Sequence, residues 1–167
     1  VVKREYSNAD AIAKMRIADK IRIPYSINNM IGFPDETREL AFDTIELNRQ
    51  FNSDNTNCSI LVPFHGTELH KICVEKGYLD PNVICAVSTQ GDTLLNMPQW
   101  KKEDITRLRD VFAMYIKFPK NRWPEIKQAE TDLGLREKLR EEFIKTYWGN
   151  ASGKIEDDIA EAAKGLF

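Results

Sequence analysis

The segment from Asn28 to Glu39 holds the residues of this sequence best suited to contact a ligand. A glycine, Gly32, and a proline, Pro34, stand where an extended stretch gives way to a helix. Gly32 permits close backbone approach, Pro34 stiffens the turn, and a helix that begins there directs unpaired N–H groups at whatever lies above the strand. The alternative interpretation is an ordinary strand–helix turn capped by Asp35, which local physics alone favours.

The cysteines and histidines are not spaced as metal ligands. Cys58, Cys73 and Cys85 are 15 and 12 residues apart, and His65 and His70 are five apart. Because no pair has the Cys-x-x-Cys spacing, we expect this chain alone to bind neither zinc nor an iron–sulfur cluster. A sparse, odd number of cysteines fits a reducing compartment and predicts a cytoplasmic protein.

The composition is that of a globular chain with one hydrophobic core. Of 167 residues, 42% are hydrophobic and 30% are charged, with a formal net charge of −2. No apolar run approaches the roughly 20 residues of a membrane helix, so no membrane partner is expected. Basic and acidic residues are interspersed, which does not indicate a nucleic-acid partner. The basic and aromatic segment 115–124 is interpreted as a helix end whose Trp123 packs on the next segment.

Hydrophobic spacing and turn residues predict alternating elements in the first 80 residues: helices over 7–22, 36–50 and 67–77, and strands over 25–31 and 58–62. The expected N-caps are Ser7 or Asn8 for the first helix, Asp35 for the second and Thr67 for the third, and Gly77 is the expected end of the third helix. Such alternation is typical of parallel β–α units. The second strand is nearly all apolar, as expected of a strand covered on both faces.

The pattern changes between residues 80 and 100. A short strand over 83–87 is followed by predicted helices over 102–117 and 135–148 and by one that begins at Ser152. The sequence therefore divides into β–α units over 1–80 and a helical region over 81–167. A complete (β/α)8 barrel takes about 250 residues. A small open sheet capped by helices and a part of a longer barrel both remain possible.

Four motifs occur in order within residues 3–80. The segments read K-R-E-Y-S at 3–7, G-F-P-D-E-T at 32–37, P-F-H-G-T-E-L at 63–69 and K-G-Y-L at 76–79. Together they resemble the "R-x-x-t" step, the "GFPGET" turn, the "P-y-p-G-T-x-L" turn and the "kGyl" ending of radical S-adenosylmethionine enzymes. The resemblance is strongest to the group with an N-terminal cobalamin-binding domain. Residues 81–167 carry no such motif.

The resemblance implies an α/β fold made of the last β–α units of a partial (β/α) barrel with parallel strands, followed by a mostly helical C-terminal region. Residues 23–31 would form the fifth barrel strand and residues 57–63 the sixth. The implied cofactors are S-adenosylmethionine and a [4Fe–4S] cluster, with cobalamin as a further one in the cobalamin group. The implied substrate is a small molecule or a peptide, and this chain would help to shape the pocket for S-adenosylmethionine and that substrate.

Site residues follow from the same resemblance, which implies contact with S-adenosylmethionine for Arg4, Asn29, Met30, Gly32, Phe33, Pro34, Pro63 and Gly66. Arg4 would meet the cofactor carboxylate, for which a guanidinium is well suited. Asn28 and His65 would reach the substrate. Since neighbouring strand residues face opposite ways, Asn28 and Asn29 cannot both point inward, and Asn29 is the preferred one. No catalytic residue and no metal ligand is assigned.

The sequence departs from the family at two points. Asp35 stands where the "GFPGET" turn has a glycine. An L-residue costs little there if the backbone has a negative φ, and an aspartate can replace the glycine as the helix cap. The Cys-x-x-x-Cys-x-x-Cys loop, the first four strands and a cobalamin motif are absent. We therefore expect this chain alone to be chemically inert, with the missing N-terminal half of the barrel or an equivalent chain as its partner. The alternative is a non-catalytic α/β module that binds a protein through its exposed strand edge or its C-terminal helices.

Overall fold

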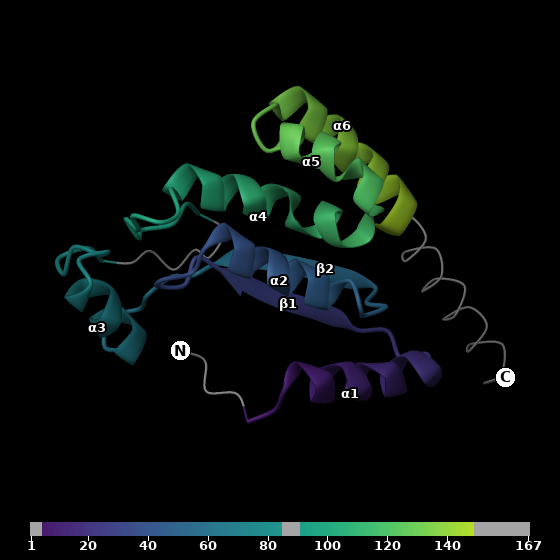
Figure 1. The fold of residues 1–167 in the computed structure, drawn as a ribbon, viewed down its shortest axis with the longest axis horizontal. Helices are drawn as coiled ribbons and strands as arrows, with labels where there is room; N and C mark the ends of the chain where they lie inside the picture. The colour runs from purple at the N-terminus through teal and green to yellow at the C-terminus, as the bar shows by residue number, and fades with distance from the viewer. Residues whose placement is uncertain (1–4, 85–90, 149–167) are drawn as a thin grey trace, which may run out of the picture.

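A computed structural model describes residues 5–84 and 91–148 (Figure 1). In these ranges the chain forms a parallel strand pair, β1 (Ser26–Ile31) and β2 (Asn55–Ile60). The helices are α1 (Asn8–Lys20), α2 (Arg38–Asn48), α3 (Glu68–Glu75), α4 (Lys102–Lys117), α5 (Trp123–Ala129) and α6 (Leu133–Phe143), with a 3₁₀ turn at Lys120–Arg122 and a π-helical turn at Ile144–Trp148. The expected α/β class is confirmed.

The two strands are joined by a crossover through α2, as parallel neighbours require. Their register runs from Ser26 opposite Asn55 to Ile31 opposite Ile60. The second strand begins three residues earlier than predicted and ends at Ile60, two residues before the predicted end. Pro63, which lacks an N–H donor, lies beyond it.

Among the described elements, α2 and α4 pack on the same face of the sheet. The side chains of Ile31 and Ile60 are buried on it, and α2 and α4 contact each other and the sheet there. On the opposite face the described side chains of both strands are exposed or half-buried, including Asn28 and Asn57. The expectation of a second strand covered on both faces is therefore wrong for the described residues. In the view of Figure 1, α4 lies above the sheet and α1 below it.

One hydrophobic core contains residues from both halves of the sequence. α4 contributes seven buried residues to it, among them Leu108 and Phe112. These pack with Ile31 and Ile60 from the sheet and with Ile126 from α5. Helices from the second half of the chain thus complete the core of the β–α units.

Several helix boundaries match the sequence predictions. α4 spans the predicted 102–117, and Ser7 caps α1 in a capping box with Asp10. Thr67 caps α3 by accepting the N–H of His70, and Gly77 follows the end of α3 with φ +70°. Val83 and Ile84 are not in a strand, and the rest of the predicted strand over 83–87 lies outside the described residues, as does the predicted last helix.

The basic and aromatic segment near the end of α4 is a structural junction, as interpreted. The Trp123 indole N–H donates to the Tyr115 carbonyl at 3.2 Å, and both rings pack edge-on against Phe42. One guanidinium nitrogen of Arg49, Nη1, lies 2.7–2.8 Å from three carbonyl oxygens of this helix end, those of Tyr115, Ile116 and Phe118. These donors satisfy carbonyls that a helix end otherwise leaves unpaired.

Candidate functional site

The carboxyl ends of β1 and β2 lie at one edge of the sheet, and a glycine-containing turn follows each strand. Gly32 has φ +85° directly after β1, and Gly66 has φ +80° after β2. The N–H of Leu61 still donates to the carbonyl of Ile31 at 2.9 Å, so the strands stay paired up to the turns. The edge at which parallel strands end is where α/β proteins place their ligands.

The first turn is held together by Glu36. Its carboxylate accepts the N–H of Gly32 at 2.5 Å and the N–H of Phe33 at 2.9 Å. Burial raises the pKa of this carboxyl group, while the two backbone donors oppose the shift. Two N–H groups that could have faced a ligand are therefore engaged by a side chain of the same turn.

Asp35 corrects one expectation about this turn, that of the N-cap. Its φ is +67°, in the left-handed region, so the condition under which an L-residue costs little is not met. The N-cap of α2 is Thr37, whose hydroxyl accepts the N–H of Leu40, and not Asp35. The Asp35 carboxylate instead lies 2.7 Å from Lys76 Nζ and accepts the Tyr78 hydroxyl at 3.0 Å. The Lys76 ammonium and the Tyr78 hydroxyl lower the pKa of Asp35. The two motifs at 32–37 and 76–79 are in contact through these groups.

The open face of the sheet carries uncharged polar side chains. Asn28 and Asn57 are opposite each other in the register, and Asn57 Nδ2 donates to Asn28 Oδ1 at 3.2 Å. Met30 and Ser59 are the next pair toward the carboxyl edge, and the Met30 side chain is 41% exposed. These four residues form what we call the open polar face.

Asn29 faces the opposite way from Asn28, toward α2, so it is not the residue that faces the open side of the sheet. It exchanges two hydrogen bonds with the buried Asn48: Asn48 Nδ2 donates to Asn29 Oδ1 at 2.8 Å, and Asn29 Nδ2 donates to Asn48 Oδ1 at 3.1 Å. The remaining amide protons bond the carbonyls of Asn57 and Thr44. Both amides are satisfied within the protein, which makes Asn29 a packing residue of the α2–sheet interface.

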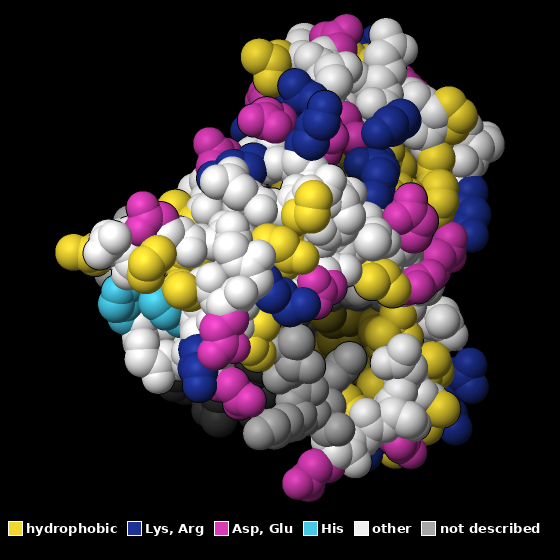
Figure 2. All heavy atoms as spheres, turned by 60° about the vertical axis from the view of Figure 1, so that its left-hand side comes forward, with side chains coloured by type: hydrophobic (Ala, Val, Ile, Leu, Met, Phe, Trp, Pro, Cys, Tyr) yellow, Lys and Arg dark blue, Asp and Glu magenta, His cyan; other side chains and the backbone are white. Residues whose placement is uncertain are grey.

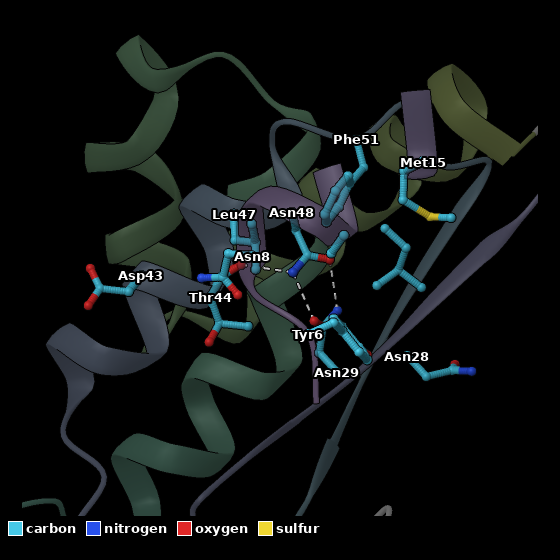
Figure 3. A pocket seen from close by; sticks show the side chains of 12 residues that line it. Tyr6, Asn8, Met15, Asn28, Asn29, Asp43, Thr44, Leu47, Asn48 and Phe51 are labelled. Atoms are coloured by element: carbon cyan, nitrogen blue, oxygen red, sulfur yellow. Dashed lines mark hydrogen bonds between the residues drawn. The ribbon is translucent and has the colours of Figure 1, made fainter. Parts of the chain in front are cut away.

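A cavity of about 340 Å³ lies beside β1, between α1 and α2 (Figure 3). Tyr6 and Met15 line it from the α1 side, and Leu47 and Phe51 line it from α2 and the turn after it. Figure 3 shows the reciprocal Asn29–Asn48 pair at its wall. The cavity does not lie at the turns, but Asn28 and Asn29, two of the predicted site residues, are part of its lining.

The remaining predicted residues divide between the core and the surface. Pro34 and Pro63 are buried, and Phe33 packs against the core, so these three support the turns. Gly66 and His65 are exposed on the loop after β2. Arg4 lies outside the described residues.

His65 lies against the second histidine of the chain. The ring centroids of His65 and His70 are 4.2 Å apart with a tilt of 53°, and Figure 2 shows the two side chains next to each other on the surface. The Nε2 atom of His70 is buried without a hydrogen-bond partner in the part of the chain that the structure describes. Sequence spacing did not reveal this contact, because it depends on the loop between β2 and α3.

The cysteines do not fit an iron–sulfur cluster. Cys73 is buried on α3 and Cys58 is half-buried on β2, and burial raises the pKa of the Cys58 thiol to about 12. Cys85 lies outside the described residues. Over residues 5–84 and 91–148, no three His, Cys, Asp or Glu side chains are grouped as metal ligands. Within those two ranges, the side chains therefore give no site for a [4Fe–4S] cluster.

Asn48 and Asn57 are the polar residues that sequence reasoning missed. Asn48 lies in the predicted helix over 36–50. Asn57 lies directly before the predicted strand over 58–62 and at the start of the implied sixth strand, and neither residue was assigned to a face. The signal that could have found Asn57 is the alternation of polar residues at 55, 57 and 59, which is typical of a strand with one solvated face.

Comparisons with known proteins leave the chain without an assigned relative. No family model, no curated protein and no solved structure matches it. None of the described helices has both the length and the apolar character needed to cross a membrane.

Proposed function

We propose that this chain forms the last β–α units of a radical S-adenosylmethionine barrel, with β1 and β2 as the fifth and sixth strands. The observation that carries the proposal is the parallel pairing of β1 and β2, with the turns containing Gly32 and Gly66 at the same edge of the sheet. This is the arrangement that two successive β–α units of a barrel require.

The backbone at Asp35 supports the same assignment. The "GFPGET" turn of the family has a glycine at this position, and here the residue has φ +67°. Glycine is the residue that adopts this conformation without steric cost, and aspartate is among the few others that tolerate it. The turn thus has the backbone shape for which a motif glycine is suited, although the side chain differs.

The open polar face is the surface that would line the S-adenosylmethionine and substrate pocket. The helices α2 and α4 cover the other face, so α2 would lie on the outside of the barrel and Asn28, Met30, Asn57 and Ser59 on the inside. Side-chain amides and a hydroxyl are suited to the polar edges of a nucleoside, and a methionine side chain is suited to a flat apolar ring. We therefore replace Asn29 by Asn28 and Asn57 as the residues proposed to contact the cofactor.

The electron chemistry would come from outside this chain. The [4Fe–4S] cluster, and cobalamin if the protein belongs to that group, would be held by the missing half of the barrel or by an equivalent chain. Such a cluster requires reducing surroundings, so we propose a cytoplasmic location. The residues of this chain would bind and position S-adenosylmethionine and the small-molecule or peptide substrate.

The test uses the natural polypeptide that contains this chain, purified without oxygen and reconstituted with iron and sulfide. We expect visible charge-transfer absorption, binding of S-adenosylmethionine by calorimetry, and dithionite-dependent release of 5′-deoxyadenosine or methyl transfer. The double variant Asn28→Ala/Asn57→Ala should weaken S-adenosylmethionine binding about thirtyfold, because two lost hydrogen bonds of about 1 kcal/mol each amount to about 2 kcal/mol. Ser26→Ala, on the same face at the opposite end of β1, is the matched control and should leave binding unchanged.

The same experiment distinguishes the alternative, a non-catalytic module that binds a protein partner. The exposed isoleucines at the C-terminal end of α1 favour this alternative: Ile17 is 59% exposed and Ile21 is 61% exposed. Apolar side chains gathered in this way often mark an interaction surface. If the natural polypeptide binds neither a cluster nor S-adenosylmethionine, the enzymatic proposal is wrong and this alternative remains.

A further inference from the structure

A second recess lies between α4 and α6 and next to β2. Its volume is about 640 Å³, and it is lined by Cys58, Arg109, Asp110, Arg136, Glu137 and Arg140, together with Leu133. The α6 residues Arg136, Glu137 and Arg140 recur at helical spacing and share one side of that helix. In Figure 2, Lys and Arg side chains lie among Asp and Glu side chains on the upper part of the molecule, the level at which α4 and α6 lie.

The charges of the lining residues do not balance. Arg109 and Arg136 share the single carboxylate of Asp110, at 2.8 Å and 2.6 Å from its two oxygens. The side chains of these two arginines are only 14% and 17% exposed. Arg140 is 61% exposed, and its nearest carboxylate, that of Glu137, is 3.5 Å away. Three guanidinium groups therefore meet two carboxylates, which leaves one net positive charge in the recess.

The hydrogen bonds hold these arginines in place before any ligand arrives. Arg136 donates from Nε to the Ala129 carbonyl at 3.0 Å and from Nη2 to the Glu130 carbonyl at 2.6 Å, beside its bond to Asp110. Arg109 donates from Nε and Nη2 to Asp110 and from Nη1 to the Gly91 carbonyl at 3.2 Å. Fixed guanidinium groups lose little side-chain entropy on binding, so an anion would find them already oriented.

We propose that this recess binds a phosphomonoester, with the phosphate group held by Arg109, Arg136 and Arg140. A phosphate presents three terminal oxygens to three donors, whereas a carboxylate presents two, and guanidinium groups match phosphate geometry. The volume of the recess leaves room for an organic group on the phosphate. The Asp110 carboxylate stays bound to Arg109 and Arg136, and the exposed Glu137 side chain can turn to solvent.

The test is a titration of the whole chain followed by backbone amide chemical shifts in low-salt buffer. The probes are phenyl phosphate, inorganic phosphate and benzoate, which has the same ring and a carboxylate instead of a phosphate. We expect phenyl phosphate to bind most tightly, with shifts confined to residues lining the recess and with weaker binding as salt is added.

Arg140→Gln is the informative variant, because Arg140 is exposed and does not connect helices. We expect it to weaken phenyl phosphate binding about fivefold or more, the effect of one charge-assisted hydrogen bond at a half-open site. Arg107→Gln is the matched control. Arg107 also pairs with an acidic residue one helical turn earlier, Asp104 at 3.2 Å, but does not line the recess.

Three results would overturn the proposal. The first is benzoate binding as tightly as phenyl phosphate, which would remove the preference for phosphate. The second is an equal loss of affinity in Arg107→Gln and Arg140→Gln, which would indicate diffuse charge attraction only. The third is the absence of saturation by phenyl phosphate below about 10 mM, an affinity too weak for a site. None of these results bears on S-adenosylmethionine binding at the open polar face.

Discussion

At the scale of single residues, the turn after β1 depends on an aspartate in a conformation that favours glycine. Asp35 has φ +67° and is tied to Lys76 and Tyr78. Asp35→Ala removes these contacts and leaves a Cβ in the left-handed region, whereas Asp35→Gly removes the same contacts without that cost. We expect the midpoint of thermal unfolding to be about 2–4 °C lower for Asp35→Ala than for Asp35→Gly. Equal midpoints would contradict a left-handed Asp35.

The two turn glycines allow backbone strain to be separated from packing. Gly32 and Gly66 have nearly the same φ, but a Cβ at Gly32 would lie 3.5 Å from Ile105 Cγ2, while one at Gly66 would meet nothing within 4 Å. Gly66→Val should lower the free energy of unfolding by about 1–2 kcal/mol, the cost of a left-handed L-residue. Gly32→Val should cost about 1–3 kcal/mol more, because its methyl groups enter the core.

Urea denaturation of the two valine variants measures this difference. Comparable losses for Gly32→Val and Gly66→Val would show that Gly32 has no packing role. In the natural polypeptide that contains this chain, Gly32→Val should also weaken S-adenosylmethionine binding, since the turn it distorts lies at the proposed pocket. Unchanged affinity there would count against the proposed site.

At the scale of elements, the buried carboxylate of Glu130, the residue that follows α5, forms an ion pair with Arg38 on α2. Glu130 is 3% exposed and accepts Arg38 at 2.5 Å, the Tyr115 hydroxyl at 2.7 Å and Lys127 at 2.9 Å. Burial alone would raise the pKa of Glu130, but the bonds from Arg38, Tyr115 and Lys127 lower it overall. A lowered pKa means that the ionised form is favoured in the folded state. The resulting stability is present at neutral pH and is lost as the pH falls through the folded-state pKa.

We expect Glu130→Gln to lower the free energy of unfolding by about 3 kcal/mol at neutral pH, because it leaves Arg38 facing a neutral partner in a buried position. The variant should also lose less stability than the wild type when the pH is lowered. Glu142→Gln is the control, since Glu142 pairs with Arg122 at the surface and should cost less than about 1 kcal/mol. Urea denaturation at neutral and acidic pH checks both statements. Similar losses for the two variants would contradict the role of Glu130.

The elements also show what the sequence could and could not predict. The helix over 102–117 and the caps at Ser7 and Thr67 were predictable, because periodicity and capping are local. The cap of α2 was misplaced because Thr37 and Asp35 are both good caps, and the turn geometry that decides between them depends on Lys76 and Tyr78 far along the chain.

The orientation of the site residues was a long-range question in the same way. Alternation in β1 predicts that Asn28 and Asn29 face opposite sides, but only the packing of α2 determines which side is covered. Asn29 lies on the covered side because the buried amide of Asn48, 19 residues later, pairs with it. The His65–His70 contact and the arginine-lined recess likewise join residues whose spacing along the chain gives no indication of proximity.

At the scale of the whole molecule, stability is distributed unevenly between the two ends of the described chain. α1 has no buried residue, while α4 has seven. α1 is held mainly by its capping box and by half-buried side chains such as Met15 that border the cavity beside β1. Helices with few buried apolar contacts open at low free-energy cost.

This distribution predicts that amide hydrogens of α1 exchange with solvent much faster than those of α4. The free energy of opening should approach the full unfolding free energy for α4 and should be about 1–2 kcal/mol for α1. The amide hydrogens of α1 should therefore exchange at least a hundredfold faster than those of α4. Hydrogen–deuterium exchange by mass spectrometry on the isolated chain measures both helices at once. If the chain forms the end of a barrel, α1 should become protected in the natural polypeptide, where a preceding strand would fill the space beside β1. Strong protection of α1 in the isolated chain would show that it is already fully packed, and would remove this reason to expect a neighbouring strand there.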